Sequence, residues 1–262
     1  MAIKLIISGC CGRMGQAIAR CALEDPVAFE IGAALESSGK PRGPGLDYSL
    51  VLGQPLPKPI LIIDVASVAI SRSMTDKEVV LIEFTTPEAT VEHTQHAQKK
   101  QIPMVIGTTG LSDAQQTVVR EAAKTIPIVF SPNMSLGVNV LYELAQLAAE
   151  RLGGAFYDVE IVESHHREKK DAPSGTAKRL RERLVAAQTV RRPEIPIHSI
   201  RAGDIVGDHT VILAGPSERL ELTHRAHGRE VFARGALAAA RFLVAQPPGL
   251  YDMSHVLRTF HG

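Results

Sequence analysis

The strongest constraint on the fold lies at the amino terminus, where an apolar run leads into the sequence SGCCGRMG at positions 8–15. Residues 3–8 are typical of a strand buried on both faces, and residues 13–24 have the apolar spacing of a helix. A strand, a glycine-rich turn and a helix in this order indicate the first unit of a dinucleotide-binding fold. The usual spacing is G-x-G-x-x-G, whereas here the glycines fall at positions 9, 12 and 15.

Each glycine of this turn has a separate task. Gly9 allows the tight turn after the strand, and Gly15 allows the helix to pack closely against the sheet. The approach of the backbone to a pyrophosphate, which the middle glycine of the usual spacing permits, passes here to Gly12. The amide groups at the helix start still supply donors and a positive dipole. The turn therefore predicts a nucleotide site.

An acidic residue stands where such a site needs one. Glu36 closes the second predicted strand, residues 29–35, about 20 residues beyond the turn, where a carboxylate binds the ribose hydroxyls. Ser37 follows and offers only a hydroxyl, whereas the 2′-phosphate of NADPH favours a cation. Lys40 and Arg42 lie close by in the following loop. The sequence favours NADH and leaves NADPH open.

The rest of the first half alternates short apolar runs with helical stretches, the pattern of a parallel sheet covered by helices. Residues 37–59 are rich in glycine and proline and are expected to form a loop.

His93 and His96 fall on a predicted surface helix, and we interpret both as structural. The sequence GTTG at positions 107–110 follows a strand, at the edge where open α/β sheets bind ligands, although a plain turn has the same composition. Strands are also predicted at 79–84, 103–107 and 127–130, and helices at 87–100, 111–124 and 137–151.

From residue 156 the pattern changes. A strand at 157–163 leads into a charged loop and a helix that starts at Ser174. Three strand-like runs without intervening helices suggest an antiparallel sheet, at 197–202, 209–213 and 219–227. An alanine-rich helix at 233–245 is expected to return to the first part of the chain.

The charged loop, ESHHREKKDAPSGT at positions 163–176, is the most informative stretch. Ser174 is a predicted helix N-cap, and the free amide groups of Gly175 and Thr176 would bind a carboxylate, with the nearby cations helping to hold a small dicarboxylate. The histidines at 165 and 166 titrate in the range that acid chemistry needs, and Lys169 is a second candidate acid. A solvated run of charges is the alternative. A metal site is disfavoured, because adjacent histidines seldom share one ion and this loop contains no cysteine.

Composition excludes several classes of function. A net charge of +1 gives no broad surface for nucleic acid, and no apolar stretch approaches the roughly 20 residues of a membrane helix. The three cysteines, all within the first 21 residues, and the lack of a targeting segment indicate the cytoplasm. The pair Cys10–Cys11 is interpreted as two small packed residues rather than as a redox pair.

Taken together, these stretches resemble one family. The sequences GRMG, FTTPEAT, VIGTTG, NMSLGVNV, RAGDIVGDHT and above all ESHHREKKDAPSGTA are similar to those of the dihydrodipicolinate reductases (4-hydroxy-tetrahydrodipicolinate reductases) of bacterial lysine and diaminopimelate synthesis. The similarity runs almost from end to end. The family's own loop is G-x-x-G-x-x-G, which accounts for the shifted glycine.

The resemblance implies an α/β fold in two parts. A Rossmann-type dinucleotide-binding domain with a parallel sheet is expected over residues 1–131 with 234–262. An α+β domain with a mixed or antiparallel sheet, for substrate binding and tetramerisation, is expected over residues 132–233. The implied activity is reduction of 4-hydroxy-tetrahydrodipicolinate to tetrahydrodipicolinate with NADH or NADPH, by a homotetramer.

Carried over by position, the resemblance also implies roles for individual residues. His165 matches the proton donor and acceptor of the family, and Lys169 its proton donor. The implied substrate contacts are His166, Ser174, Gly175, Thr176 and Thr109. The implied coenzyme contacts are Gly9, Cys10, Cys11, Gly12, Arg13, Met14, Glu36, Gly107, Thr108, Thr109, Ser131, Pro132, Asn133 and Met134. No residue is assigned to a metal ion.

Three positions depart from the family pattern. Ser37 replaces an arginine that some members use for the 2′-phosphate, Thr86 stands where other members have arginine, and Cys11 stands where glycine or alanine is frequent. Two other functions stay open on the residues alone. One is another dehydrogenase of a small dicarboxylate, such as an aspartate dehydrogenase, and the other is a nucleotide-sensing protein without catalysis.

Overall fold

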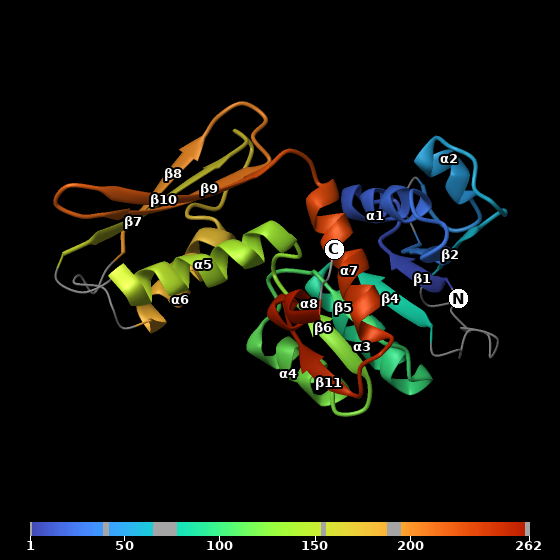
Figure 1. Ribbon diagram of the computed structural model, residues 1–262. Helices are drawn as coiled ribbons and strands as arrows, with labels where there is room; N and C mark the ends of the chain where they lie inside the picture. Colours follow the sequence, from blue (N-terminus) through green and yellow to red (C-terminus); the bar gives the residue numbers. More distant parts are fainter. Residues whose placement is uncertain (1, 39–41, 65–77, 153–155, 188–194, 260–262) are drawn as a thin grey trace. The chain divides into compact units, whose positions relative to one another are not determined.

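The computed structural model describes residues 2–38, 42–64, 78–152, 156–187 and 195–259 (Figure 1). The chain divides into two compact units, Met1–Met134 with Phe232–Gly262, and Ser135–Val231. Within the described residues, no helix combines the length and the apolar character that a membrane span requires.

The first unit is built on a seven-stranded sheet in the order β11-β6-β5-β4-β1-β2-β3, and all its pairings are parallel. The six strands other than the edge strand β11 therefore follow the order 3-2-1-4-5-6 of dinucleotide-binding folds. The strands are β1 (Ile3–Ser8), β2 (Phe29–Glu36), β3 (Ile62–Asp64), β4 (Val79–Glu83), β5 (Met104–Ile106), β6 (Pro127–Phe130) and β11 (Gly249–Tyr251). The helices are α1 (Arg13–Leu23), α2 (Tyr48–Leu52), α3 (Pro87–Lys100), α4 (Asp113–Ala122), α7 (Glu230–Leu243), which lies in this unit from Phe232 on, and α8 (Met253–Thr259).

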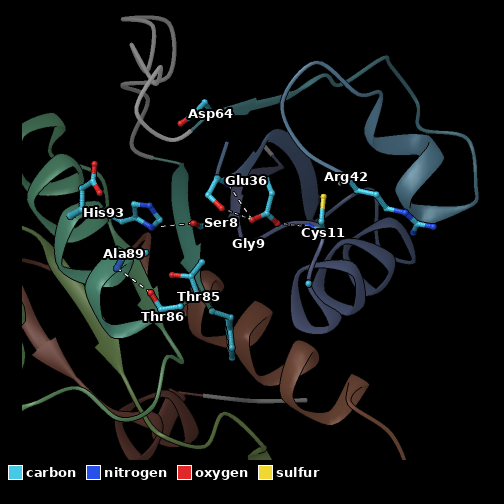
Figure 2. A pocket seen from close by; sticks show the side chains of 14 residues that line it. Ser8, Gly9, Cys11, Glu36, Arg42, Asp64, Thr85, Thr86, Ala89 and His93 are labelled. Atoms are coloured by element: carbon cyan, nitrogen blue, oxygen red, sulfur yellow. Dashed lines mark hydrogen bonds between the residues drawn. The ribbon is translucent and has the colours of Figure 1, made fainter. Parts of the chain in front are cut away.

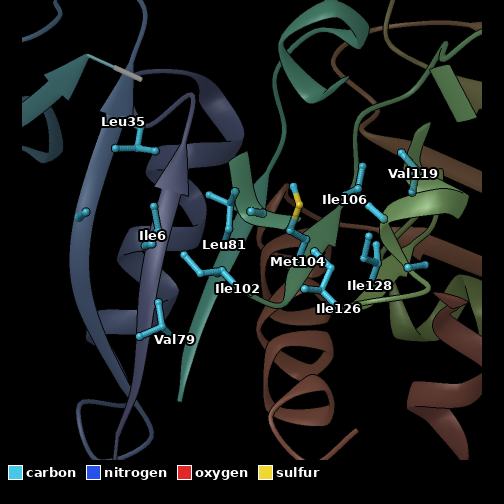
Figure 3. Close-up of a cluster of buried hydrophobic side chains, with 14 of the residues drawn as sticks. Ile6, Leu35, Val79, Leu81, Ile102, Met104, Ile106, Val119, Ile126 and Ile128 are labelled. Atoms are coloured by element: carbon cyan, nitrogen blue, oxygen red, sulfur yellow. The ribbon is translucent and has the colours of Figure 1, made fainter. Parts of the chain in front are cut away.

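The sequence explains these elements locally. All five residues of β4 are buried, as expected for a parallel strand covered on both faces. Helix α3 begins at Pro87, in its first turn, and the Thr86 side chain caps it. Helix α4 begins with a capping box between Ser112 and Gln115. Buried strand side chains such as Leu81, Met104 and Ile128 pack with Val119 of α4 in one cluster (Figure 3).

The second unit contains a four-stranded sheet in the order β10-β9-β7-β8, packed on helices α5 (Leu136–Leu152) and α6 (Gly175–Ala186). Its strands are β7 (Asp158–His165), β8 (Ile197–Arg201), β9 (Gly207–Ala214) and β10 (Arg219–Ala226). Burial alternates along β9, where His209, Val211 and Leu213 face the helices.

The prediction of an antiparallel sheet from the three successive strands is wrong for the first of them. Strand β8 pairs with β7, not with β9, and the pairing is parallel. The reason is connectivity, because α6 lies between β7 and β8 in the chain and supplies the crossover that parallel neighbours need. The remaining pairings, β7 with β9 and β9 with β10, are antiparallel, so the sheet is mixed.

The segment 37–59 is not wholly a loop. It contains the five-residue helix α2, which is capped by the Asp47 side chain and ends at Gly53. The edge strands β3 and β11 and the final helix α8 were also not predicted, because each is short and carries little periodicity of its own. Lys40, which the sequence placed near the coenzyme, lies outside the described residues.

Candidate active site

A cavity of about 720 Å³ opens in the first unit at the carboxyl ends of the strands (Figure 2). Strand β1 has β2 on one side and β4 on the other, so the strand order reverses beside it. In open α/β sheets this reversal is where ligands bind. The lining residues are Ser8, Gly9, Cys11, Gly12, Glu36, Ser37, Arg42, Asp64, Phe84, Thr85, Thr86, Ala89, Glu92 and His93.

The glycine-rich turn forms one wall of this cavity. Gly9 has a φ of +67°, a conformation that favours glycine, and its carbonyl accepts a hydrogen bond from the Gly12 amide at 2.9 Å. Gly12 caps α1 without a side chain, so no side chain competes for the first amide groups of the helix. This is the arrangement in which a helix start binds an anionic group.

Gly15 is expected to tolerate no side chain. A Cβ atom there would lie 2.4 Å from the Gly9 carbonyl oxygen and 2.7 Å from the Cys10 Cα atom, and neither backbone atom can yield cheaply. Gly15→Ala should lower the free energy of unfolding by about 1–3 kcal/mol, as measured by urea denaturation. Gly175→Ala is the control, because its added methyl group meets nothing within 4 Å. Equal stability of the two variants would contradict the close packing of α1.

Glu36 stands at the end of β2 beside the turn. Its buried carboxylate accepts hydrogen bonds from the amide of Cys11 at 3.2 Å and from the amide of Ser37 at 3.1 Å. Arg42 lines the same cavity. The three positions that depart from the family pattern, Cys11, Ser37 and Thr86, all line the cavity.

A residue that the sequence did not indicate supports the turn from behind. Tyr48 of α2 is fully buried, and its hydroxyl lies 3.1 Å from the Cys10 carbonyl oxygen and 3.2 Å from that of Gly15. Burial raises the pKa of Tyr48, so its hydroxyl stays protonated and donates. The segment expected to be only a loop thus fixes the backbone of the glycine-rich turn.

A buried polar network lies on the other side of the cavity, and it contains His93, which lies on the buried face of its helix. His93 is 5% exposed, and its Nδ1 atom contacts the buried Glu83 carboxylate. The same atom lies 3.1 Å from the Ser8 hydroxyl (Figure 2). The Thr85 amide donates to Glu83 at 3.0 Å, and the Thr90 hydroxyl donates to Thr108 at 2.8 Å. Helix α3 turns His93 inward because a buried carboxylate at the end of β4 needs partners. His96, by contrast, is exposed.

The other predicted coenzyme segments stand at the carboxyl ends of the next two strands. Gly107 and Thr108 follow β5, and Ser131 follows β6. Thr108 and Ser131 are buried, whereas Thr109 and Pro132 are exposed. None of the residues 107–109 and 131–134 lines the 720 Å³ cavity. The segments share the sheet edge with the cavity but not its walls.

The second unit gathers its charged loop around one carboxylate, Glu163. This side chain is 0% exposed and accepts hydrogen bonds from Arg201, at 2.8 and 3.0 Å, and from the Ser174 amide at 3.3 Å. It also contacts His165 Nδ1. Burial by itself raises the pKa of Glu163, but hydrogen bonds from Arg201, Ser199 and His165 outweigh it and lower the pKa to about 2.

Arg201 ties the loop to this carboxylate. Besides Glu163, its guanidinium donates to the carbonyl oxygens of Lys169 at 3.2 Å and Asp171 at 2.6 Å. One planar cation thus bonds a buried strand carboxylate and the backbone of the loop at two points. Arg201 is the residue that fixes the path of the loop.

His165 ends strand β7 and is nearly buried. Burial lowers its pKa, although contact with Glu163 opposes this, so the imidazole is neutral at neutral pH. His209 packs edge-on against it, with the ring centroids 5.2 Å apart. A Cβ atom at Gly207 would lie 3.1 Å from His165 Nε2, so glycine keeps the space beside this nitrogen open.

The remaining predicted site residues lie in the loop and at the start of α6. Lys169 Nζ lies 2.8 Å from the Asp171 carboxylate, and this contact lowers the pKa of Asp171.

Ser174 caps α6 as predicted, accepting a hydrogen bond from the Ala177 amide at 3.2 Å. Its hydroxyl also lies 3.0 Å from His209 Nε2, and burial lowers the pKa of His209 to about 3. His166 and Thr176 are half-buried, and Gly175 is exposed.

The structure therefore places His165, Lys169 and Ser174 in contact with Glu163 or with its partner Arg201. It adds Glu163, Arg201 and His209 to the residues predicted from the sequence. A local signal existed for Glu163, because it precedes His165 by two positions in a strand and must share its face. Arg201 gives no local signal, since it reaches Glu163 from 38 positions away along the chain.

Comparisons with known proteins agree over both units. Residues 3–134 match the model of the dihydrodipicolinate reductase N-terminus, and residues 137–257 match that of the C-terminus. The chain is 44% identical to the 4-hydroxy-tetrahydrodipicolinate reductase of Rubrobacter xylanophilus, over 97% of this chain and 98% of the relative. It is 42% identical to that of Nitrosomonas eutropha, over 97% and 98% of the two chains.

A solved structure is similar over the same length. The dipicolinate-bound dihydrodipicolinate reductase from Paenisporosarcina sp. TG-14 superposes with a TM-score of 0.77 at 26% identity, over 96% of this chain and 98% of the other. An amine dehydrogenase from Mycobacterium smegmatis shares the fold, with a TM-score of 0.63 at 13% identity over 97% and 96% of the two chains. Both family models and the sequence relatives lead to one assignment. The chain belongs to the dihydrodipicolinate reductase family.

Proposed function

We propose that this chain reduces 4-hydroxy-tetrahydrodipicolinate, through its dehydrated form, to tetrahydrodipicolinate with a nicotinamide coenzyme. The relatives that carry this activity in their names match almost the whole chain. The observation that carries the proposal is the buried pair of Glu163 and Arg201, which gathers His165, Lys169 and the start of α6 in one place. A solvated run of charges, the alternative, needs no such buried centre.

The family is NAD(P)H-dependent, and the cavity of the first unit fits a dinucleotide. The turn at Gly9 and the start of α1, which has no side-chain cap, fit a pyrophosphate. The Glu36 carboxylate fits the adenosine ribose. We further propose that NADH is preferred. The Glu36 carboxylate repels a 2′-phosphate, and Ser37, the next residue, provides no positive charge to bind it. Arg42 lines the cavity and accounts for any residual use of NADPH.

Ser37→Arg is expected to shift the preference toward NADPH. A guanidinium at this position can bond a 2′-phosphate, and hydrogen bonds to charged groups correspond to about 10- to 100-fold in affinity. The ratio of kcat/KM for NADPH to that for NADH, measured by steady-state kinetics, should rise by this factor. Ser38→Arg, one position beyond and outside the cavity lining, is the control. An equal shift in both variants would point to general charge attraction instead.

The substrate is a cyclic dicarboxylate. The Paenisporosarcina enzyme is described with dipicolinate bound, which is a cyclic dicarboxylate as well. We assign one carboxylate to the amide groups of Gly175 and Thr176. Lys169 is the neighbouring cation, and His166 is a neighbouring hydrogen-bond donor. Ser174 caps the same helix start, and Thr109 is the substrate contact proposed on the first unit.

The reaction adds a hydride and a proton across a conjugated ring. The coenzyme, when bound, supplies the hydride. The chain supplies the proton, and we assign this step to the ammonium group of Lys169, whose proton goes to the carbanion-like carbon that the hydride addition leaves. His165 has a lowered pKa and acts in its neutral form, with its Nδ1–H held by Glu163 and Nε2 available as an acceptor. Positioning of this kind can contribute about 7–11 kcal/mol.

A coupled assay tests the function directly. The diaminopimelate-pathway substrate, generated in the cuvette, should cause NADH oxidation far faster than oxaloacetate with ammonia does. The reverse order would favour the aspartate dehydrogenase alternative, which the relatives do not support. Tight NADH binding without turnover of either substrate would favour the nucleotide-sensing alternative.

The family resemblance also supports a homotetramer that works in the cytoplasm. The second unit offers exposed apolar side chains on two strands of its sheet, Ile200 at 46% and Leu220 at 38% exposure. We propose that this sheet forms the contacts between subunits. None of the three cysteines, all of which the structure describes, forms a disulfide, and a reducing compartment keeps cysteines in this form.

A further inference from the structure

Two cysteine thiols and one carboxylate lie close together at the coenzyme cavity. Cys10 and Cys11 follow Gly9 in the glycine-rich turn; Cys11 and Glu36 line the cavity, whereas Cys10 is buried. The Sγ atoms of the two cysteines are 3.8 Å apart, although the residues are adjacent in sequence. One ligand atom from each of the three residues lies within 4.8 Å of the others.

The spacing of the two sulfur atoms matches a tetrahedral metal site. Zinc–thiolate bonds are about 2.3 Å long, and two of them at the tetrahedral angle place their sulfur atoms about 3.8 Å apart. The observed separation of 3.8 Å agrees with this value. The Glu36 carboxylate supplies the third ligand, and the open cavity leaves a fourth position for water.

Oxidation to a disulfide fits the same pair less well. Adjacent Cα atoms are about 3.8 Å apart, whereas disulfides usually join Cα atoms roughly 4.4–6.8 Å apart. The two sulfur atoms would also have to approach to about 2.05 Å. A metal ion that bridges the sulfur atoms avoids both distortions.

We propose that Cys10, Cys11 and Glu36 form a site for a thiophilic divalent cation of the zinc class, and that an ion bound there excludes the coenzyme. Binding replaces each S–H bond by a sulfur–metal bond and releases two protons to water. Arg42 lines the same cavity and offsets part of the charge of two thiolates and one carboxylate. The exclusion of coenzyme rests on the proposed function, because it assigns Glu36 to the ribose.

The two thiols differ in exposure. Cys10 is fully buried. Cys11 is half-buried and lines the cavity, so an ion that enters the cavity reaches it first. Cys21, the third cysteine, is buried in α1 and does not belong to the group.

Titration of the reduced full-length protein with Cd²⁺ tests the site without any activity measurement. Charge-transfer absorption from two thiolates is expected to saturate at one ion per chain, and Zn²⁺ should displace the Cd²⁺. Cys10→Ala and Cys11→Ala are each expected to weaken binding by at least about 100-fold, since loss of a ligand costs no less than loss of a supporting group. Cys21→Ala is the matched control and should bind like the wild type. Unchanged binding in Cys10→Ala, or loss of binding in Cys21→Ala, would overturn the site.

Coenzyme binding forms a separate arm of the experiment. NADH binding, followed by its fluorescence, should weaken in proportion to Zn²⁺ occupancy, and saturating NADH should weaken Zn²⁺ binding by the same factor. If Cd²⁺ binds both thiols but NADH affinity is unchanged, the exclusion is overturned together with the place given to the coenzyme, while the metal site stands. If Cd²⁺ binding is absent and NADH still binds, the metal proposal fails and the proposed function does not.

Discussion

Replacing Arg201 with methionine is expected to lower the free energy of unfolding by about 3–5 kcal/mol, because a buried carboxylate then loses its cation. Glu163 is 0% exposed, and Arg201 donates to its two oxygens at 2.8 and 3.0 Å. Methionine keeps an apolar side chain of similar length but provides no donor. The loss should appear in urea unfolding at neutral pH, together with a loss of activity as the Lys169 loop is released.

A second variant separates the unpaired charge from a general packing defect. Glu163→Gln combined with Arg201→Met removes the buried charge and leaves a neutral amide, so the double variant should be more stable than Arg201→Met alone. If the double variant is as unstable as the single one or less stable, the loss comes from packing and the buried ion pair is not its cause. Glu163→Gln alone is expected to destabilise as well, because it leaves Arg201 without its charge partner.

The effect of pH has a definite sign. Hydrogen bonds from Arg201 and its neighbours outweigh burial and lower the pKa of Glu163 from 4.5 to about 2. A carboxyl group with a lowered folded-state pKa stabilises the fold above its unfolded pKa and loses this contribution as the pH falls toward the folded value. The difference in stability between wild type and Arg201→Met should therefore shrink between neutral pH and about pH 3. A constant difference would contradict an ionised Glu163.

The first unit was largely predictable because its signals are local. The strands at 3–8, 79–84 and 127–130 are near-continuous apolar runs, as buried parallel strands must be, and the helices between them carry recognisable caps. The residues that were missed depend on distant contacts. Tyr48 lies in a segment rich in glycine and proline, and only its burial under the glycine-rich turn reveals its role.

The loop of the second unit illustrates the same division. The residue types at positions 165–176 indicated proton transfer and carboxylate binding, and the N-cap at Ser174 is present. The centre of the cluster is not apparent from the sequence, because three successive strands predict an antiparallel neighbour for β8, whereas its neighbour is β7 in a parallel pairing. Once β8 lies parallel to β7, His165 stands opposite Arg201 and Glu163 opposite Ser199. Strand register, which a single sequence does not specify, therefore decides which residues surround the loop.

Lys169→Ala is expected to lower kcat by about 10²–10⁴-fold, the usual contribution of a general acid. The fold should be unaffected, because the ammonium group pairs only with the Asp171 carboxylate in the described residues, and that side chain is 56% exposed. Exposed ion pairs contribute little to stability, so thermal unfolding of the variant should match the wild type. The measurement is steady-state reduction of the coupled substrate with saturating NADH.

Lys170→Ala provides the matched control, since it removes the same charge from the next position in the loop, where the side chain is exposed. Its kcat should equal that of the wild type. If Lys170→Ala loses as much activity as Lys169→Ala, the loop acts through its summed charge and not through one proton donor. If Lys169→Ala keeps full activity, the proton must come from His165, and a burial-lowered pKa would then require the rate to rise as the pH falls. The dependence of the Lys169→Ala rate on pH therefore tests whether His165 donates the proton.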